Sequence, residues 1–169
     1  YLEIVKLLLA NGADIHAQED RALLSAVTNN KIEITKFLLA NGADIHASED
    51  EALLESIRSD NIDVVKLLIA NGADINAQGG YALTIAVPKG NLGIFKLLLD
   101  NGANIHTRND QILLDAVGRG NIEMVKLLVA KGADIHTQND YALVRAAMLN
   151  YIDIVEFLIA NGASIHAQD

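Results

Sequence analysis

Residues 30–45 read Asn-Lys-Ile-Glu-Ile-Thr-Lys-Phe-Leu-Leu-Ala-Asn-Gly-Ala-Asp-Ile, and closely similar stretches recur along the whole chain. The glycine of each copy lies 30 residues from the next, with no insertion or deletion between Gly12 and Gly162. A fixed period of this size is typical of a repeat array, in which each unit buries its apolar face only against its neighbours.

One repeat, taken from residue 20 to residue 50, predicts two short helices. The first covers residues 21–27, and Asp20 is its expected N-cap, with a carboxylate that accepts hydrogen bonds from free backbone N–H groups. The second covers residues 32–40, and Gly42 supplies the left-handed residue that ends it. Helices this short are marginal alone because nucleation is costly, so we expect them to hold only when stacked.

The composition favours an aliphatic interior, because 51% of the 169 residues are hydrophobic but only 4% are aromatic. The formal net charge of −9 argues against DNA, RNA or an anionic membrane as the main ligand, since phosphate binding needs clustered Lys and Arg. The chain has no cysteine, which excludes a disulfide framework and is compatible with a reducing compartment. No apolar run is long enough to span a bilayer and no secretory leader opens the chain, so we expect an intracellular, cytoplasmic protein.

The second-helix stretch with its Gly-Ala-Asp ending resembles the ankyrin repeat family. The stretch returns around Gly72, Gly102, Gly132 and Gly162, so the resemblance covers the whole chain. It implies an all-α fold, an ankyrin-type helix-turn-helix solenoid. This short form is similar to the ankyrin arrays of giant DNA viruses of amoebae, which would place the protein in the host cytoplasm or the virion.

Two features depart from the family pattern. The unit has 30 residues where about 33 are usual, and the shortfall falls in the connector. We therefore expect shortened loops in place of full β-hairpin fingers. The family's Thr-Pro-Leu-His motif in the first helix is also replaced, for example by Arg-Ala-Leu-Leu at residues 21–24.

The repeat boundaries predict one ankyrin-repeat array over residues 1–169. It divides into a partial unit 1–20 and repeats 21–50, 51–80, 81–110, 111–140 and 141–169. The chain starts as a second helix does, and neither end offers a polar capping repeat, so we expect a segment of a longer array. An engineered or incomplete chain is the alternative.

Five histidines share one position of the repeat, which Asn76 takes in the remaining copy: His16, His46, His106, His136 and His166. Equivalent atoms of adjacent repeats lie about 10 Å apart, one helix spacing, whereas zinc ligands lie about 2 Å from one ion. We therefore expect no metal site. The family's Asn at this position implies a residue that braces the connector. The alternative is a pH-responsive ladder whose protonation loosens the stack.

A second periodic series also reads as structural rather than catalytic. Asp14, Asp44, Asp74 and Asp134 become Asn104 and Ser164 in the other copies. These three residue types interchange where a short acceptor braces a turn. No phosphate loop, nucleophile elbow or paired metal-ligand motif occurs, so the sequence predicts no catalytic residue, no cofactor and no enzyme.

The positions at which the repeats differ are the candidate binding residues. In the resembled family, the connector and the exposed side of the first helix form the concave, ligand-facing surface. Tyr and Arg are enriched at interaction hot spots. We predict partner contacts at Glu51, Glu55, Tyr81, Asp115, Arg119, Tyr141, Arg145, Met148, Leu149 and Tyr151. Neutral drift on solvated positions is the alternative.

These residues predict a protein–protein interaction scaffold that binds a protein or a peptide, but neither nucleic acid nor membrane. The second repeat is densely acidic from Glu49 to Glu55, which favours a basic partner through electrostatic steering. We expect a monomer. The alternative function is a structural or self-assembling spacer in a larger assembly.

Overall fold

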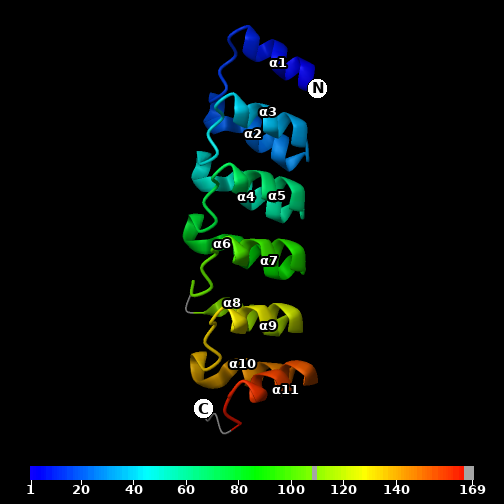
Figure 1. Ribbon diagram of the computed structural model, residues 1–169, viewed down its shortest axis with the longest axis vertical. Helices are drawn as coiled ribbons and strands as arrows, with labels where there is room; N and C mark the ends of the chain where they lie inside the picture. Colours follow the sequence, from blue (N-terminus) through cyan, green and yellow to red (C-terminus); the bar gives the residue numbers. More distant parts are fainter. Residues whose placement is uncertain (108–109, 166–169) are drawn as a thin grey trace. The chain divides into compact units, whose positions relative to one another are not determined.

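The computed structural model describes residues 1–107 and 110–165, and within them the chain forms eleven α-helices and no strand (Figure 1). In chain order the helices are α1 (Leu2–Ala10), α2 (Ala17–Thr28), α3 (Ile32–Ala40), α4 (Ala47–Arg58), α5 (Ile62–Ala70), α6 (Ala77–Lys89), α7 (Leu92–Asp100), α8 (Gln111–Gly118), α9 (Ile122–Ala130), α10 (Thr137–Met148) and α11 (Ile152–Ala160). The predicted all-α fold class, with short connectors in place of β-hairpin fingers, is confirmed for this part of the chain.

The helices group into two compact units, Tyr1–Ala82 and Leu83–Asp169. In the first unit, α2 packs against α3 and α4, α4 packs against α5, and α3 contacts α1 and α5. In the second unit, α8 packs against α9 and α10, α10 packs against α11, and α9 contacts α7 and α11. Within each unit, therefore, first helices stack on first helices and second helices on second helices.

The core of each unit is a stripe of aliphatic side chains repeated from helix to helix. In α5, Val64, Val65 and Leu68 are fully buried. The equivalent positions of α9 carry Met124 and Val125, with Leu128 one turn later, also fully buried. The i, i+1, i+4 spacing places these side chains on one helix face, which is the face that the neighbouring helices cover.

Each second helix ends as its glycine predicts. Gly42 has φ +93°, a conformation open to glycine at little cost. The N–H of Gly42 bonds the carbonyl of Leu39, and the N–H of Ala43 bonds that of Leu38, each at 3.1 Å. This pair of bonds is the Schellman motif, and Ile45 folds back into the core beside it, 9% exposed.

The connector then closes as one turn of left-handed backbone. Three successive residues, Gln18, Glu19 and Asp20, have φ near +55°. The same conformation recurs at residues 48–50, 78–80 and 138–140. This compact turn replaces a finger in the shortened repeat, and it leads directly into the right-handed part of each first helix.

The predicted N-cap function of the aspartates is wrong. Asp20 and Asp50 are buried, and neither α2 nor α4 has a side-chain cap. The left-handed turn instead directs each carboxylate to the next connector, where it accepts a 2.8 Å hydrogen bond from the N–H of Asp44 or Asp74. The aspartate therefore links one repeat to the next, because its acceptor serves a backbone group 24 residues further on.

Candidate functional site

A cavity of 390 Å³ lies in the second unit, along the carboxyl-terminal ends of three successive first helices. Helices α6, α8 and α10 contribute its walls, which are Thr84, Val87, Pro88, Asp115, Gly118, Arg119 and Arg145. We call it the α6–α8–α10 groove. It brings together three of the residues predicted to contact a partner, Asp115, Arg119 and Arg145.

Two glycines at the end of α8, Gly118 within the helix and Gly120 just after it, shape one wall of this groove. A Cβ atom on Gly118 would lie 2.7 Å from Cζ and 2.8 Å from Nε of Arg145, so the guanidinium rests against bare backbone. A Cβ atom on Gly120 would lie 2.8 Å from Cε1 and Cζ of Tyr151, so the ring of Tyr151 lies against Gly120 in the same way. The predicted residues Arg145 and Tyr151 are thus both seated by the turn at residues 118–120.

Sequence reasoning missed the glycines and the α6 side of the groove. The available signal was the Gly-Arg-Gly stretch at residues 118–120, where the first two repeats carry Thr-Asn-Asn and Arg-Ser-Asp. A glycine marks a place where another group approaches the backbone closely. Which group approaches depends on the stacking of α10 on α8, and the periodicity alone does not specify it.

The charges in the groove are two cations and one anion. Asp115 accepts a 3.2 Å hydrogen bond from the side-chain amide of Gln111. Neither Arg119 nor Arg145 makes an ion pair with any of the described residues. Arg145 is half-buried and Arg119 is exposed. The groove therefore presents two guanidinium groups whose donors are open to an incoming acceptor.

The predicted acidic residues of the first unit are arranged differently. Glu51 and Glu55 both bind the guanidinium of Arg58, at 2.5 and 3.1 Å. This internal pairing reduces the negative charge that they offer to a partner. Tyr81 is half-buried in the same unit. These three residues therefore do not belong to the α6–α8–α10 groove.

The remaining predicted residues continue the surface along α10. Tyr141 is 41% exposed, and Met148 at the end of the helix is 76% exposed. Together with Arg145 they follow an i, i+4, i+7 spacing, which places them on one helix face. Leu149, 44% exposed, follows directly after α10. The structure thus gathers most of the predicted contacts of the second unit beside the groove.

The histidines brace the connectors, as predicted, but through the buried aspartates. Nδ1 of His46 lies 3.1 Å from Asp50, and Nδ1 of His136 lies 2.8 Å from Asp140. His16 and His106 make the same pair with the aspartate four residues on. His166 lies outside the described residues. Among the described residues no three His, Asp or Glu side chains come together in a way that could hold a metal ion.

The pH-dependent loosening considered from the sequence has the wrong sign at His46. The hydrogen bond to Asp50, followed by the charge of Asp50, raises the pKa of His46, and Asp44 and Asp74 act in the same direction. Burial of the ring opposes this rise only in part. Protonation of His46 is therefore favoured in the folded chain and strengthens its pair with Asp50.

A comparison with models of protein families identifies the family of this chain. A model described as ankyrin repeats (3 copies) matches residues 1–79, 46–109 and 83–169. The chain belongs to the ankyrin repeat family. Ankyrin repeats are generally protein–protein interaction modules, and proteins built from them are typically non-enzymatic scaffolds. No curated protein matched the chain.

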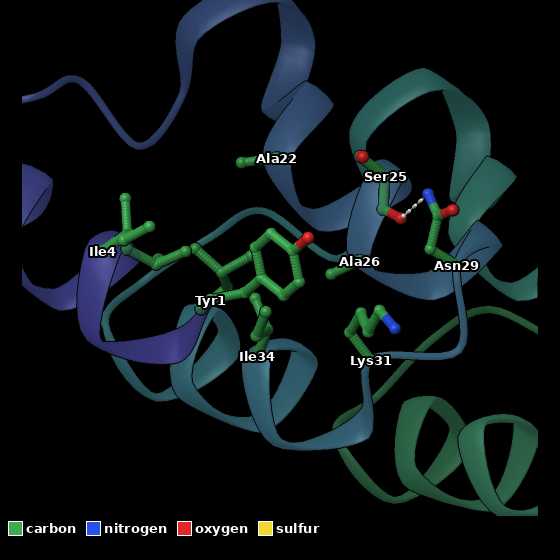
Figure 2. A pocket seen from close by; sticks show the side chains of 10 residues that line it. Tyr1, Ile4, Ala22, Ser25, Ala26, Asn29, Lys31 and Ile34 are labelled. Atoms are coloured by element: carbon green, nitrogen blue, oxygen red, sulfur yellow. Dashed lines mark hydrogen bonds between the residues drawn. The ribbon is translucent and has the colours of Figure 1, made fainter.

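This ankyrin protein has a second and larger cavity, of 620 Å³, in its first unit. Figure 2 shows Tyr1 beside Ala26 of α2 and Ile34 of α3, with Asn29 bonded to the carbonyl of Ser25. The walls are mostly apolar, and none of the predicted contact residues lies among them. It offers shape and apolar surface, but no paired charges.

A membrane-spanning helix is not found among residues 1–107 and 110–165 of this ankyrin protein. The longest of its helices, α6, has 13 residues. A helix needs about 20 apolar residues to cross the hydrocarbon core.

Proposed function

We propose that this chain is a protein-recognition module that binds a folded protein or an extended peptide on its first-helix and connector face. The observation that carries the proposal is the exposed stripe of α10. Tyr141, Arg145 and Met148 lie on one helix face, and this face borders the α6–α8–α10 groove. Tyr and Arg anchors beside a concave site are the arrangement typical of interaction hot spots.

Tyr141 and Met148 of this stripe are exposed, and Arg145 between them is half-buried. Met148 is 76% exposed, so its side chain contributes little hydrophobic stabilisation to the free protein. Met148 is unbranched and polarisable, so it can adapt to the surface of a partner. Hydrophobic side chains of this size, gathered beside charged ones, are typical of an interaction surface.

The test is a quantitative pull-down that compares the wild-type chain with the double variant Tyr141→Ala/Arg145→Ala. Loss of the two anchors is expected to weaken capture of a specific partner by about 30-fold for each residue and up to about 1,000-fold for both, since each hot-spot residue contributes about 2 kcal/mol. Lys126→Ala on α9 is the matched surface control, because Lys126 is half-exposed and pairs only with Glu123 of its own helix. Equal capture by all three chains would refute the proposed face.

Self-association is the second candidate function, because the exposed apolar side chains Met148 and Leu149 at the end of α10 would serve equally well to bind a second copy of the chain. Light scattering coupled to size-exclusion chromatography separates the two functions: a recognition module runs as a monomer, and a self-assembling spacer gives a mass that rises with concentration.

A further inference from the structure

The α6–α8–α10 groove has the charge pattern of a site for an anion. Its charged lining residues are Arg119, Arg145 and Asp115, so the local balance is positive in a chain whose formal charge is −9. Arg58 lies at the matching end of α4, and its guanidinium is already paired with Glu51 and Glu55. The two groove arginines have no such partner among the described residues.

The packing of α10 against α8 fixes the position of the Arg145 side chain. Its guanidinium lies against Gly118, in the space that any larger side chain would fill. Residue 118 belongs to α8 and Arg145 to α10, so packing of the two helices holds the guanidinium over the groove. A planar, pre-positioned guanidinium donates two parallel hydrogen bonds to a carboxylate.

We propose that the α6–α8–α10 groove binds the carboxylate of a Glu or Asp side chain from an extended peptide. The inference rests on the proposed protein-recognition function and adds the chemistry of the partner. Arg119 and Arg145 donate to the carboxylate oxygens. Val87 and Pro88 provide the apolar wall along which the methylene groups of the acidic side chain lie.

The lining favours a carboxylate over a phosphate. Asp115 places a negative charge inside the groove, and its carboxylate is only partly engaged by Gln111. A phosphate monoester carries close to two negative charges at pH 7, so it would leave the groove with a net negative charge, whereas one carboxylate neutralises the surplus of Arg119 and Arg145 over Asp115. Two arginines against one aspartate leave a surplus that matches a single anionic charge.

The experiment selects ligands from a phage-displayed random dodecapeptide library on the immobilised chain. The enriched sequence is then synthesised with Glu, Gln or phosphoserine at its acidic position, and binding is measured by fluorescence anisotropy. We expect the Gln peptide to bind about 10- to 100-fold more weakly than the Glu peptide, as for loss of a charge-assisted hydrogen bond. The phosphoserine peptide is expected to bind more weakly than the Glu peptide.

Protein variants locate the site. Arg119→Ala/Arg145→Ala is expected to remove the difference between the Glu and Gln peptides, whereas Lys126→Ala, which also removes a positive charge, leaves it unchanged. Gly118→Ala tests the geometry without altering charge. Its methyl group displaces the guanidinium of Arg145, and helical backbone at residue 118 accepts alanine, so the fold is retained while the Glu preference falls.

The outcomes separate the two levels of the proposal. Peptides that bind through Tyr141 but tolerate Glu→Gln would overturn the carboxylate site and leave protein recognition standing. Stronger binding of the phosphoserine peptide would overturn the choice of carboxylate. Failure to enrich any peptide whose binding depends on Tyr141 or Arg145 would overturn the carboxylate site and count against the proposed face as well.

Discussion

At the scale of single residues, the most consequential side chains are the buried aspartates of three connectors, Asp20, Asp50 and Asp140. Asp50 is 4% exposed, and its carboxylate accepts hydrogen bonds from the N–H of Asp74 and from His46. A buried backbone N–H without an acceptor costs about 1–3 kcal/mol. Asp20 and Asp50 therefore each stabilise the junction of two repeats, and not only their own turn.

Asp50→Ala is expected to lower the free energy of unfolding by about 1–3 kcal/mol, because it removes the acceptor of the part-buried hydrogen bond from the N–H of Asp74. Asp50→Asn retains an acceptor and tolerates the left-handed backbone, so it costs about 1 kcal/mol. Urea denaturation measures both. The control, Asp63→Ala at an exposed position of α5, is expected to cost less than about 1 kcal/mol. Equal costs for Asp50→Ala and Asp63→Ala would contradict the linking function of Asp50.

The pairing of His46 with Asp50 predicts that the folded chain gains stability on acidification, whereas repulsion between protonated histidines would lower it. Its pKa is raised in the folded chain by the hydrogen bond to Asp50. The extra stability is fully present below the unfolded pKa, about 6.5, and is lost as the pH rises through the folded pKa. The side chain is 58% exposed, so solvent screening limits the effect to less than about 1 kcal/mol.

The measurement compares wild type with His46→Asn, the residue that the chain itself carries at position 76. The difference in the free energy of unfolding between the two proteins is expected to be larger at pH 5.5 than at pH 8. His46→Asn removes the titrating group and retains a short polar side chain. A wild-type chain that loses stability relative to the variant on acidification would refute the pairing.

At the scale of the elements, the left-handed turn explains the Gly79-Gly80 pair. Gly79 and Gly80 have φ +69° and +77°, at the positions that Glu49 and Asp50 occupy in the preceding connector with φ +56° and +60°. A left-handed conformation costs a non-glycine residue about 1–2 kcal/mol. The connector at residues 78–80 therefore relieves strain that the other connectors retain, but it gives up the carboxylate that Asp50 supplies.

Glu49→Gly is expected to stabilise the chain by about 0.5–1 kcal/mol. The relief of left-handed strain exceeds the entropy that glycine loses on folding. Glu49 is exposed, and the hydrogen bond that its backbone carbonyl accepts from Gln78 remains. Thermal and urea unfolding measure the change. Lys66→Gly in the right-handed interior of α5 is the matched control and is expected to destabilise by about 1 kcal/mol. A loss of stability in both variants would contradict the strain.

At the scale of the whole molecule, the chain is two compact units whose stability comes from neighbouring repeats. The repeat from residue 81 to residue 110 has the least favourable local helix energetics. Pro88 lies inside α6 and lacks the N–H that would bond the carbonyl of Thr84, and Gly93 lies in α7, where glycine costs about 0.5–1 kcal/mol relative to alanine.

Hydrogen exchange is therefore expected to be fastest, among the internal helices, in the segment from residue 81 to residue 100. Peptides that cover residues 51–70 provide the comparison within the same chain. Gly93→Glu is expected to slow exchange in α7, because Gly93 is exposed and the matching positions of other repeats carry Glu or Asp. Equal protection of these segments from exchange would show that other contacts offset the destabilising effects of Pro88 and Gly93.

Local chemistry allowed much of this molecule to be predicted from its sequence. The 30-residue period, the i, i+3, i+4 apolar stripe and the glycine after each second helix determine the helix pairs, the bounds of each second helix and the buried face. These features depend on residues a few positions apart, so the sequence alone specifies them. The candidate binding residues of the second unit were selected for a related reason, because they vary at positions that helical periodicity leaves exposed, and their contact with a partner stays a prediction.

Only the tertiary structure decided what those side chains contact. The sequence is equally compatible with Asp20 as the cap of its own helix. In the folded chain, stacking of the repeats places the N–H of Asp44 2.8 Å from the Asp20 carboxylate, which accepts its hydrogen bond. Likewise, Arg145 lies on Gly118 because α10 packs on α8. Contacts of this kind join residues 24 or more positions apart, and their geometry is set by how far one repeat shifts and turns relative to the next. Helical periodicity repeats within each unit and contains no information about that shift.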